Sequence, residues 1–167
     1  MRTSQPINFN ALLDQHHDTL YWMIRKIVLV HHDAEDVLQN TWIKIYKGLP
    51  SFQGKSTLKT WMYRIAYNEC MRFLKQKKPN FSLDEVDTDY LDFLASDRYF
   101  NAQKATHLLH SALATLSERE RHVFSFKYFD ALKFNAIARI IEHNENSVKT
   151  VYYKAEKKIK TYLTKHH

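Results

Sequence analysis

The chain has 167 residues, of which 25 are lysine or arginine and 18 are aspartate or glutamate, so its formal net charge is +7. This length fits one ordinary domain or two small ones, and a 44% hydrophobic content excludes a wholly disordered chain. Two glycines and one cysteine exclude glycine-rich phosphate loops, intrachain disulfides and cysteine-based zinc sites. Without a signal-peptide pattern or a long apolar run, we expect a cytoplasmic protein that does not insert into membranes.

The charge is divided into three blocks. Residues 1–78 and residues 104–167 each contain 12 basic and 6 acidic side chains, whereas residues 79–103 contain 1 basic and 6 acidic ones. The simplest interpretation is two basic domains joined by an acidic linker, and the alternative is one domain with an acidic surface loop. Basic domains commonly bind acidic partners, nucleic acid above all.

The first block has helical periodicity. Apolar residues recur at intervals of three and four from Phe9 to Val28, which predicts a long amphipathic helix. Asp33 is suited to cap a second helix, which Gly48 and Pro50 close. After a loop, Ser56 or Thr57 is expected to begin a third helix that ends in the basic segment 75–78.

The second block is also helical and ends in the outline of a helix-turn-helix. An apolar-periodic segment over 105–116 is followed by Ser117 and Glu120 in the spacing of a capping box, which predicts a helix to about Tyr128. A short helix over 134–141 and a last helix capped by Asn144 complete the outline. The predicted fold is therefore all-α, with domains at 1–78 and 104–167 and a linker at 79–103.

Two polar helix faces point to nucleic acid. The face of the last helix opposite its apolar stripe is almost free of acidic residues and comprises Asn146, Lys149, Thr150, Tyr153, Lys154, Lys157 and Lys160. Such side chains suit base edges and phosphates, although a merely solvated lysine-rich face is the alternative. On the third helix, Tyr63 and Tyr67 lie with Arg64 and Asn68 opposite the stripe that includes Trp61. This mixture suits a single strand, unless the two tyrosines cover a neighbouring helix.

Several sequence motifs together resemble those of one protein family. The segments are DAEDVLQNTW at 33–42, FQGKS at 52–56, TWMYRIAYN at 60–68, LSERER at 116–121 and SVKT at 147–150. Their order and spacing resemble the second and fourth conserved regions of an extracytoplasmic-function (ECF) sigma factor of the sigma-70 family. The resemblance covers nearly the whole chain except for the acidic segment and the extreme ends.

The resemblance implies roles for the first domain. The second helix would dock on the clamp of the largest subunit of core RNA polymerase through Asp36, Gln39, Asn40 and Ile43, with Asn40 in place of the family's usual glutamate. The loop at 52–56 and the third helix would open the minus-ten element and hold an unstacked base. The candidates for this contact are Lys55, Ser56, Lys59, Tyr63, Arg64, Tyr67 and Asn68.

The second domain would read the duplex at the minus-thirty-five element. The residues implied by the resemblance are Asn144, Asn146, Ser147, Lys149, Thr150, Tyr153, Lys154 and Lys157. The family usually has glycine where Glu142 stands and an aliphatic residue where His143 stands. In a turn of the family's shape Glu142 would need a left-handed backbone, which is unfavourable without glycine, so we expect a reshaped turn or a helix extended by one residue.

These expectations combine into a transcription initiation factor with no enzymatic activity and no cofactor. Its expected partners are core RNA polymerase, promoter DNA and an anti-sigma factor, with the acidic linker running through polymerase. One alternative is a stand-alone helix-turn-helix regulator. The other is a small helical enzyme or metal protein, suggested only by ten histidines that have no carboxylate spacing to complete a site.

Overall fold

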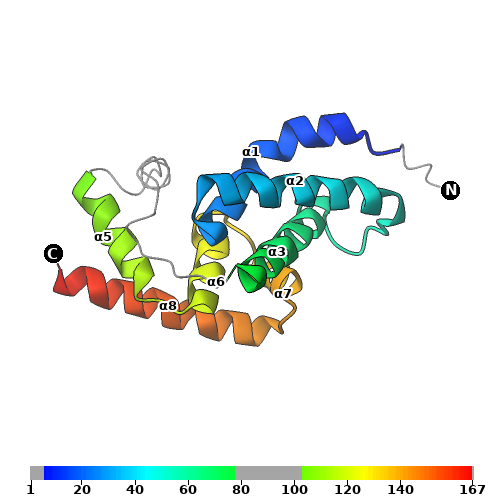
Figure 1. Cartoon of the computed structure of the whole chain (residues 1–167). Coiled ribbons are helices and arrows are strands. Elements are labelled where there is room, and N and C mark those ends of the chain that lie inside the picture. The colour runs from blue at the N-terminus through cyan, green and yellow to red at the C-terminus, as the bar shows by residue number, and fades with distance from the viewer. Residues whose placement is uncertain (1–5, 78–102, 167) are drawn as a thin grey trace. The chain divides into compact units, whose positions relative to one another are not determined.

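A computed structural model describes residues 6–77 and 103–166 of the chain. The chain divides into two compact units, Met1–Pro79 and Asn80–His167 (Figure 1). The described parts of both units are helical and contain no strand, which confirms the all-α prediction. The predicted linker lies outside the described residues except for its last position, Gln103, where a helix begins.

The first unit is a bundle of three helices. It consists of α1 (Phe9–Val28), α2 (His31–Gly48), the short 3-10 helix η1 (Leu49–Ser51) and α3 (Leu58–Gln76), and each α-helix contacts the other two. The side chain of Asn8 caps α1 by accepting hydrogen bonds from the N–H groups of Asn10 and Ala11. The bundle core contains Leu20, Ile24, Val28, Ala34, Ile45, Met62 and Ala66.

The start of α2 differs from the prediction. Asp33 was expected to cap this helix, but the helix begins at His31 and its N-cap is Val30, which makes no side-chain cap. Asp33 instead lies buried in the first turn, where a carboxylate is favoured by the helix dipole, and it pairs with Lys77 Nζ at 2.5 Å. Tertiary pairing with the far end of α3 therefore replaces the local capping role.

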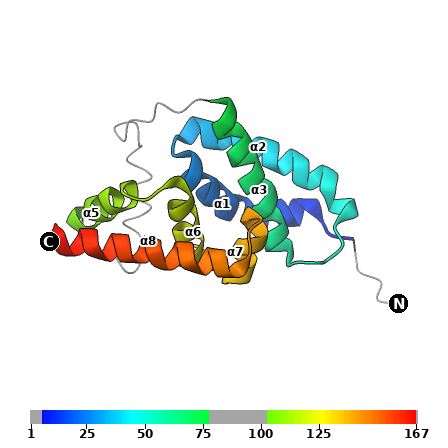
Figure 2. The same cartoon turned by 90° about the horizontal axis from the view of Figure 1, so that it is seen from below.

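The second unit is built around one long helix. It consists of α5 (Gln103–Ala114), α6 (Glu118–Tyr128), α7 (Phe134–Ile141) and α8 (Glu145–Lys165). Figures 1 and 2 show that α8 runs alongside the other three helices, and it contacts each of them. The predicted capping box of Ser117 and Glu120 is present at the start of α6. The described core includes Leu109, Leu113, Val123, Phe126, Ile137, Ile140, Val148, Ala155 and Ile159.

The turn between α7 and α8 differs from the prediction, because Glu142 adopts the left-handed backbone that the turn was expected to avoid, with φ 57° and ψ 49°. The N–H of His143 donates to the carbonyl of Ala138 at 3.0 Å, so the end of α7 is closed without a glycine. Asn144 then caps α8 by accepting from the N–H of Ser147 at 2.7 Å. Because α7 ends at Ile141, the helix is not extended, and the start of α8 is fixed at Glu145.

We expect Glu142→Gly to make the second unit more stable than Glu142→Ala by about 1 kcal/mol, because only glycine adopts a left-handed backbone without steric cost. The alanine variant is the matched control, since both changes remove the same carboxylate. Urea unfolding followed through amide signals of α6 and α8 measures the difference. Equal stability of the two variants would contradict the assignment of strain to this backbone.

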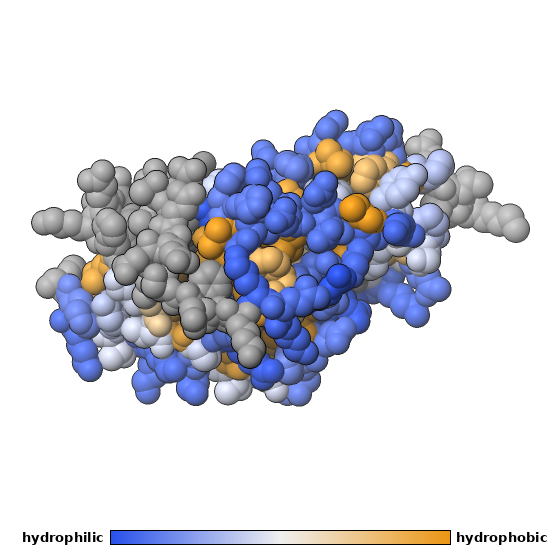
Figure 3. All heavy atoms as spheres, in the orientation of Figure 1, coloured by the Kyte–Doolittle hydropathy of each residue, from blue (hydrophilic) through white to orange (hydrophobic). Residues whose placement is uncertain are grey.

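The surface is mostly hydrophilic. Over α1 and α2, Figure 3 shows exposed apolar side chains as separate patches in a largely polar face. Among the residues whose exposure the structure describes, Ile7, Ile43, Tyr46 and Tyr153 are the large hydrophobic ones that are exposed. Among residues 6–77 and 103–166, no helix is both long and apolar enough to cross a membrane.

Candidate functional site

One exposed face of α2 carries all four side chains for which a polymerase contact is expected. Asp36, Gln39, Asn40 and Ile43 are all exposed, and their spacing of three and four places them on the same side of the helix. The opposite side packs in the core through Val37, Thr41 and Ile45. The exposed fraction of Ile43 is 48%, which is unusual for an isoleucine without a partner surface.

A groove of about 710 Å³ runs between α1 and α2 beside this face. Its apolar lining includes Phe9, Leu13, Trp42, Ile43 and Tyr46, and its polar lining includes Glu35, Asp36 and Gln39. The ring of Phe9 makes edge contacts with Trp42 at 5.8 Å and with Tyr46 at 5.1 Å, so aromatic rings of both helices meet in the apolar part. Apolar surface with a polar rim is typical of a protein-binding site.

Sequence reasoning missed Tyr46, whose side chain is 64% exposed next to Ile43. The available signal was its place three residues after Ile43 on the polar side of the helix. Asn40, by contrast, does not line the groove.

The histidines at the start of α2 pair with neighbours on the bundle. His31 Nδ1 lies 2.5 Å from the hydroxyl of Tyr21, and its Nε2 lies 3.4 Å from Glu35. His32 Nε2 lies 3.8 Å from Asp36 one turn along the helix. Within the described ranges, no group of three or more histidine, cysteine, aspartate or glutamate side chains is arranged to hold a metal ion.

The loop before α3 encloses a second hollow, of about 910 Å³, lined in part by Ile7, Tyr46, Phe52 and Gly54. Gly54 has a φ of 69°, which favours glycine, and the space where a Cβ would lie is open. Thr57 caps α3 by accepting from the N–H of Thr60 at 3.1 Å. Lys55 is exposed, and Ser56 is half-buried with its hydroxyl bonded to the carbonyl of Thr57 at 3.1 Å.

Trp61 supports this loop from α3. It is half-buried rather than part of the core as predicted, and its ring lies 5.1 Å from that of Phe52. Its Cζ2 would lie 3.1 Å from a Cβ added to Gly48. The end of α2 therefore approaches the indole closely, which positions the loop against α3.

Tyr63 corrects the prediction for the polar face of α3. Its side chain is 1% exposed, so the expectation that it contacts a DNA strand is wrong, and the alternative that it covers a neighbouring helix holds. The reason is that α3 packs against both α1 and α2, which widens its buried arc beyond one apolar stripe and also buries Thr60. Lys59 Nζ lies 5.4 Å from the centre of the Tyr63 ring.

The rest of the predicted face of α3 remains accessible. Arg64 and Asn68 are exposed and Tyr67 is half-buried. Their spacing places all three on one side of the helix. The combination of a guanidinium, a phenol ring and an amide can stack on bases and bind phosphates.

On α8, four exposed side chains form a row on successive turns: Asn146, Thr150, Tyr153 and Lys157. The opposite side of the helix is buried through Val148, Ala155 and Ile159. The exposed fraction of Tyr153 is 57%. We call these four residues the outward row; they offer amide, hydroxyl, phenol and ammonium groups, a set that can contact base edges and phosphates.

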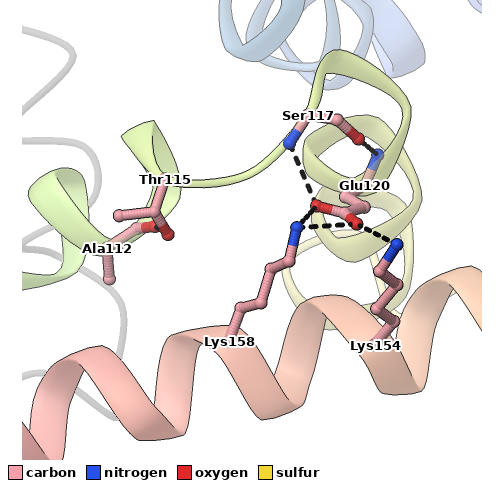
Figure 4. Close-up of polar contacts among 6 residues, drawn as sticks. All are labelled: Ala112, Thr115, Ser117, Glu120, Lys154 and Lys158. Carbon is pink, nitrogen blue, oxygen red and sulfur yellow. Dashed lines mark hydrogen bonds and ion pairs between the residues drawn. The ribbon is translucent and has the colours of Figure 1, made fainter.

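The other predicted residues of α8 have structural partners. Asn144 and Ser147 form the helix cap described above, and Lys149 lies 3.4 Å from Glu145. Lys154 Nζ lies 3.6 Å from Glu120 on α6, so its charge faces a carboxylate of the protein (Figure 4). Lys154 is therefore paired within the protein, and its contact with DNA stays a prediction.

Sequence reasoning also missed Lys127 of α6. Its Nζ lies 4.5 Å from the ring centre of Phe134, and Lys149 Nζ lies 6.0 Å from the same ring. This grouping of two cations on one aromatic ring depends on the packing of three helices, so no local sequence signal identifies it.

Comparison with known families matches both units. The family model described as Sigma-70 region 2 matches residues 12–79, and the one described as Sigma-70, region 4 matches residues 106–159. Together the two models span most of the chain, one in each compact unit.

Similar proteins match at least 90% of the chain. RNA polymerase sigma factor SigV of Bacillus subtilis is 28% identical over 98% of this chain and 95% of its own length. ECF RNA polymerase sigma factor SigW of the same organism is 26% identical over 93% of this chain and 88% of its own. RNA polymerase sigma-H factor of Pseudomonas aeruginosa is 24% identical over 90% of this chain and 83% of its own.

Two solved structures share the fold. One is the sigma factor RpoE in complex with the anti-sigma factor NepR from Bartonella quintana, with a TM-score of 0.72 and 18% identity over 95% of this chain and 98% of that one. The other is CnrH in complex with the cytosolic domain of CnrY, with a TM-score of 0.70 and 17% identity over 95% of this chain and 89% of that one.

Proposed function

The chain belongs to the sigma-70 family of RNA polymerase sigma factors, in its ECF group, and we propose how its two units share the work of starting transcription. It directs core RNA polymerase to promoters and catalyses no reaction itself. One observation carries the proposal: the chain that matches both region 2 and region 4 also has an exposed face on each of α2, α3 and α8. We assign polymerase binding to the first face, strand opening to the second and duplex reading to the third.

Core RNA polymerase would bind the exposed face of α2. Ile43 and Tyr46 offer apolar area at the edge of the groove, and Asp36 and Gln39 provide polar contacts beside it. An apolar centre with a polar rim is the usual composition of a specific protein interface. The partner we infer is the clamp of the largest polymerase subunit.

The opened strand of the minus-ten element would lie along α3 and the loop that precedes it. Arg64, Tyr67 and Asn68 form the accessible part of α3, and Lys55 lies exposed in the loop. A base taken out of the stack loses a few kcal/mol, which stacking and hydrogen bonds in a pocket offset. The hollow beside Phe52 and Gly54 has room for such a base.

Duplex DNA at the minus-thirty-five element would contact the outward row of α8. Asn146 and Thr150 lie near the start of the helix, where side chains in a helix-turn-helix reach base edges. Lys157 lies further along, at a position suited to a phosphate.

We also propose an anti-sigma factor as a partner, because two structures of this fold are complexes with such proteins or with a cytosolic domain. The groove between α1 and α2 is accessible for it. An anti-sigma factor bound there would compete with polymerase, so holding and release of the chain would control its activity in the cytoplasm.

Run-off transcription tests the proposal. Core polymerase with the purified chain should give a promoter-dependent transcript that neither component gives alone. A chain that binds promoter DNA without core polymerase but supports no transcript would instead favour a stand-alone helix-turn-helix regulator, which leaves the faces of α2 and α3 without a role.

We expect Tyr67→Ala to reduce open-complex formation about tenfold or more, because stacking of one base on an aromatic ring is worth about 1–3 kcal/mol. Permanganate footprinting measures the opened bases, and a gel-shift assay measures the closed complex, which should change little. Tyr67→Phe retains the ring and is the matched control. Equal losses in Tyr67→Ala and Tyr67→Phe, or a parallel loss of closed complex, would contradict stacking at this position.

A further inference from the structure

One carboxylate in the second unit gathers cations from another helix. Glu120 of α6 is 5% exposed, and it accepts a hydrogen bond from the N–H of Ser117 at 3.0 Å. Lys158 of α8 donates to its two oxygens at 3.0 and 2.9 Å, and Lys154 lies 3.6 Å away. Figure 4 shows both lysines rising from α8 toward the same carboxylate.

The environment keeps this carboxylate ionised. Burial alone raises the pKa of Glu120, but the hydrogen bonds from Lys158 and from Ser117, together with the charges of Lys158 and Lys154, lower it by more, so the net shift is downward. At neutral pH the group is therefore a fixed negative charge facing two lysines. The two hydrogen bonds from Lys158 join opposite charges, and such bonds are stronger than those between neutral groups.

The other ion pairs along α8 are of a different kind. Lys149 with Glu145 and Lys160 with Glu156 are pairs within one helix, four residues apart, and both are largely accessible. Such pairs contribute about 0.3–0.5 kcal/mol and break easily. The pairing at Glu120, by contrast, joins α8 to a second helix.

The position of Lys154 gives the pairing a consequence for DNA. Lys154 follows Tyr153 directly and lies one turn after Thr150, at the edge of the outward row. Its side chain is 66% exposed, so its ammonium has access to a phosphate whenever it leaves Glu120. Each lysine that neutralises a phosphate strengthens binding to any duplex without adding sequence information.

We propose that Glu120, held in place by Lys158, is a specificity-determining positioning residue that competes with DNA phosphates for Lys154. By holding this cation, it lowers affinity for non-promoter duplex and leaves recognition to the outward row. The inference rests on the proposed duplex-reading role of α8.

The test is Glu120→Gln in the full chain, assembled with core polymerase. Glutamine retains the shape and an acceptor for the N–H of Ser117, so the capping box is kept. Fluorescence anisotropy over a range of salt concentrations measures binding to a promoter duplex and to a scrambled one. We expect tighter binding to the scrambled duplex, a salt slope steeper by about one, and a several-fold lower promoter preference.

Two variants locate the effect. Glu156→Gln makes the same change in net charge and frees Lys160 from an accessible pair, so its slope should change less than that of Glu120→Gln. Glu120→Gln combined with Lys154→Ala should restore the wild-type slope. An equal response of Glu156→Gln would attribute the effect to net charge and overturn the inference.

A further variant keeps the test decisive if Glu120→Gln does not fold. Lys154→Ala alone should leave the salt slope almost unchanged, whereas Lys157→Ala should make it shallower by about one. If the two variants reduce the salt slope equally, the inference is overturned. It is also overturned if Glu120→Gln loses affinity for the promoter duplex and for the scrambled duplex in parallel, with no change in slope. A wild-type holoenzyme that shows no promoter preference overturns the proposed function itself, and the inference with it.

Discussion

Ile43→Glu is expected to weaken binding of the chain to core RNA polymerase about 30-fold or more, because a central apolar contact in an interface is commonly worth at least about 2 kcal/mol. Ile43 is 48% exposed at the edge of the groove between α1 and α2, beside Tyr46. A glutamate there would lose its hydration on docking. The first unit should remain folded, since the side chain is not part of the bundle core.

Fluorescence anisotropy of the labelled chain titrated with core polymerase measures this loss, and run-off transcription measures its consequence. The matched control is Tyr153→Glu, which changes another large exposed residue in the second unit. It should leave affinity for core polymerase unchanged and reduce promoter binding instead. If Ile43→Glu binds core polymerase as tightly as the wild type, the assignment of this face is wrong.

The helices were predictable because their apolar periodicity and caps are local. The capping box of Ser117 and Glu120 and the cap at Asn144 both follow from a few neighbouring residues, and the structure confirms both of them. Asp33 is the exception, because its carboxylate pairs with Lys77 from the far end of α3 instead of capping its own helix. Such a pairing between distant segments has no local signal.

The exposed faces proposed as binding sites could be predicted only for a helix that buries a single apolar stripe. That condition holds for α8, whose outward row is exposed as expected. It fails for α3, which packs against two helices and buries Tyr63 as well as the stripe. Lys154 has the predicted position on α8, but its partner is a carboxylate on α6 that helix periodicity does not reveal.

The stability of the second unit is expected to fall as the pH is lowered from 7 to 5, through one buried histidine. His122 of α6 is 2% exposed, and burial, helped by the charge of Arg121, lowers its pKa to about 3. The unfolded chain has an ordinary histidine pKa near 6.5, so between these two values it binds one proton more than the folded unit. The contribution of neutral His122 is therefore fully present above about pH 6.5 and is lost progressively as the pH falls toward 3.

Between pH 7 and 5 this linkage corresponds to a loss of about 2 kcal/mol in the free energy of unfolding. Urea unfolding followed through amide signals of α6 measures it. His122→Gln should remove most of the slope, whereas His143→Gln, a change at an exposed histidine of the same unit, should retain it. A wild-type unit whose stability does not change over this range, or an unchanged slope in His122→Gln, would show that His122 takes up its proton in the folded state. Because His122 lies two residues after Glu120, acid would weaken α6 at the point where it holds α8, so promoter binding should decline over the same range.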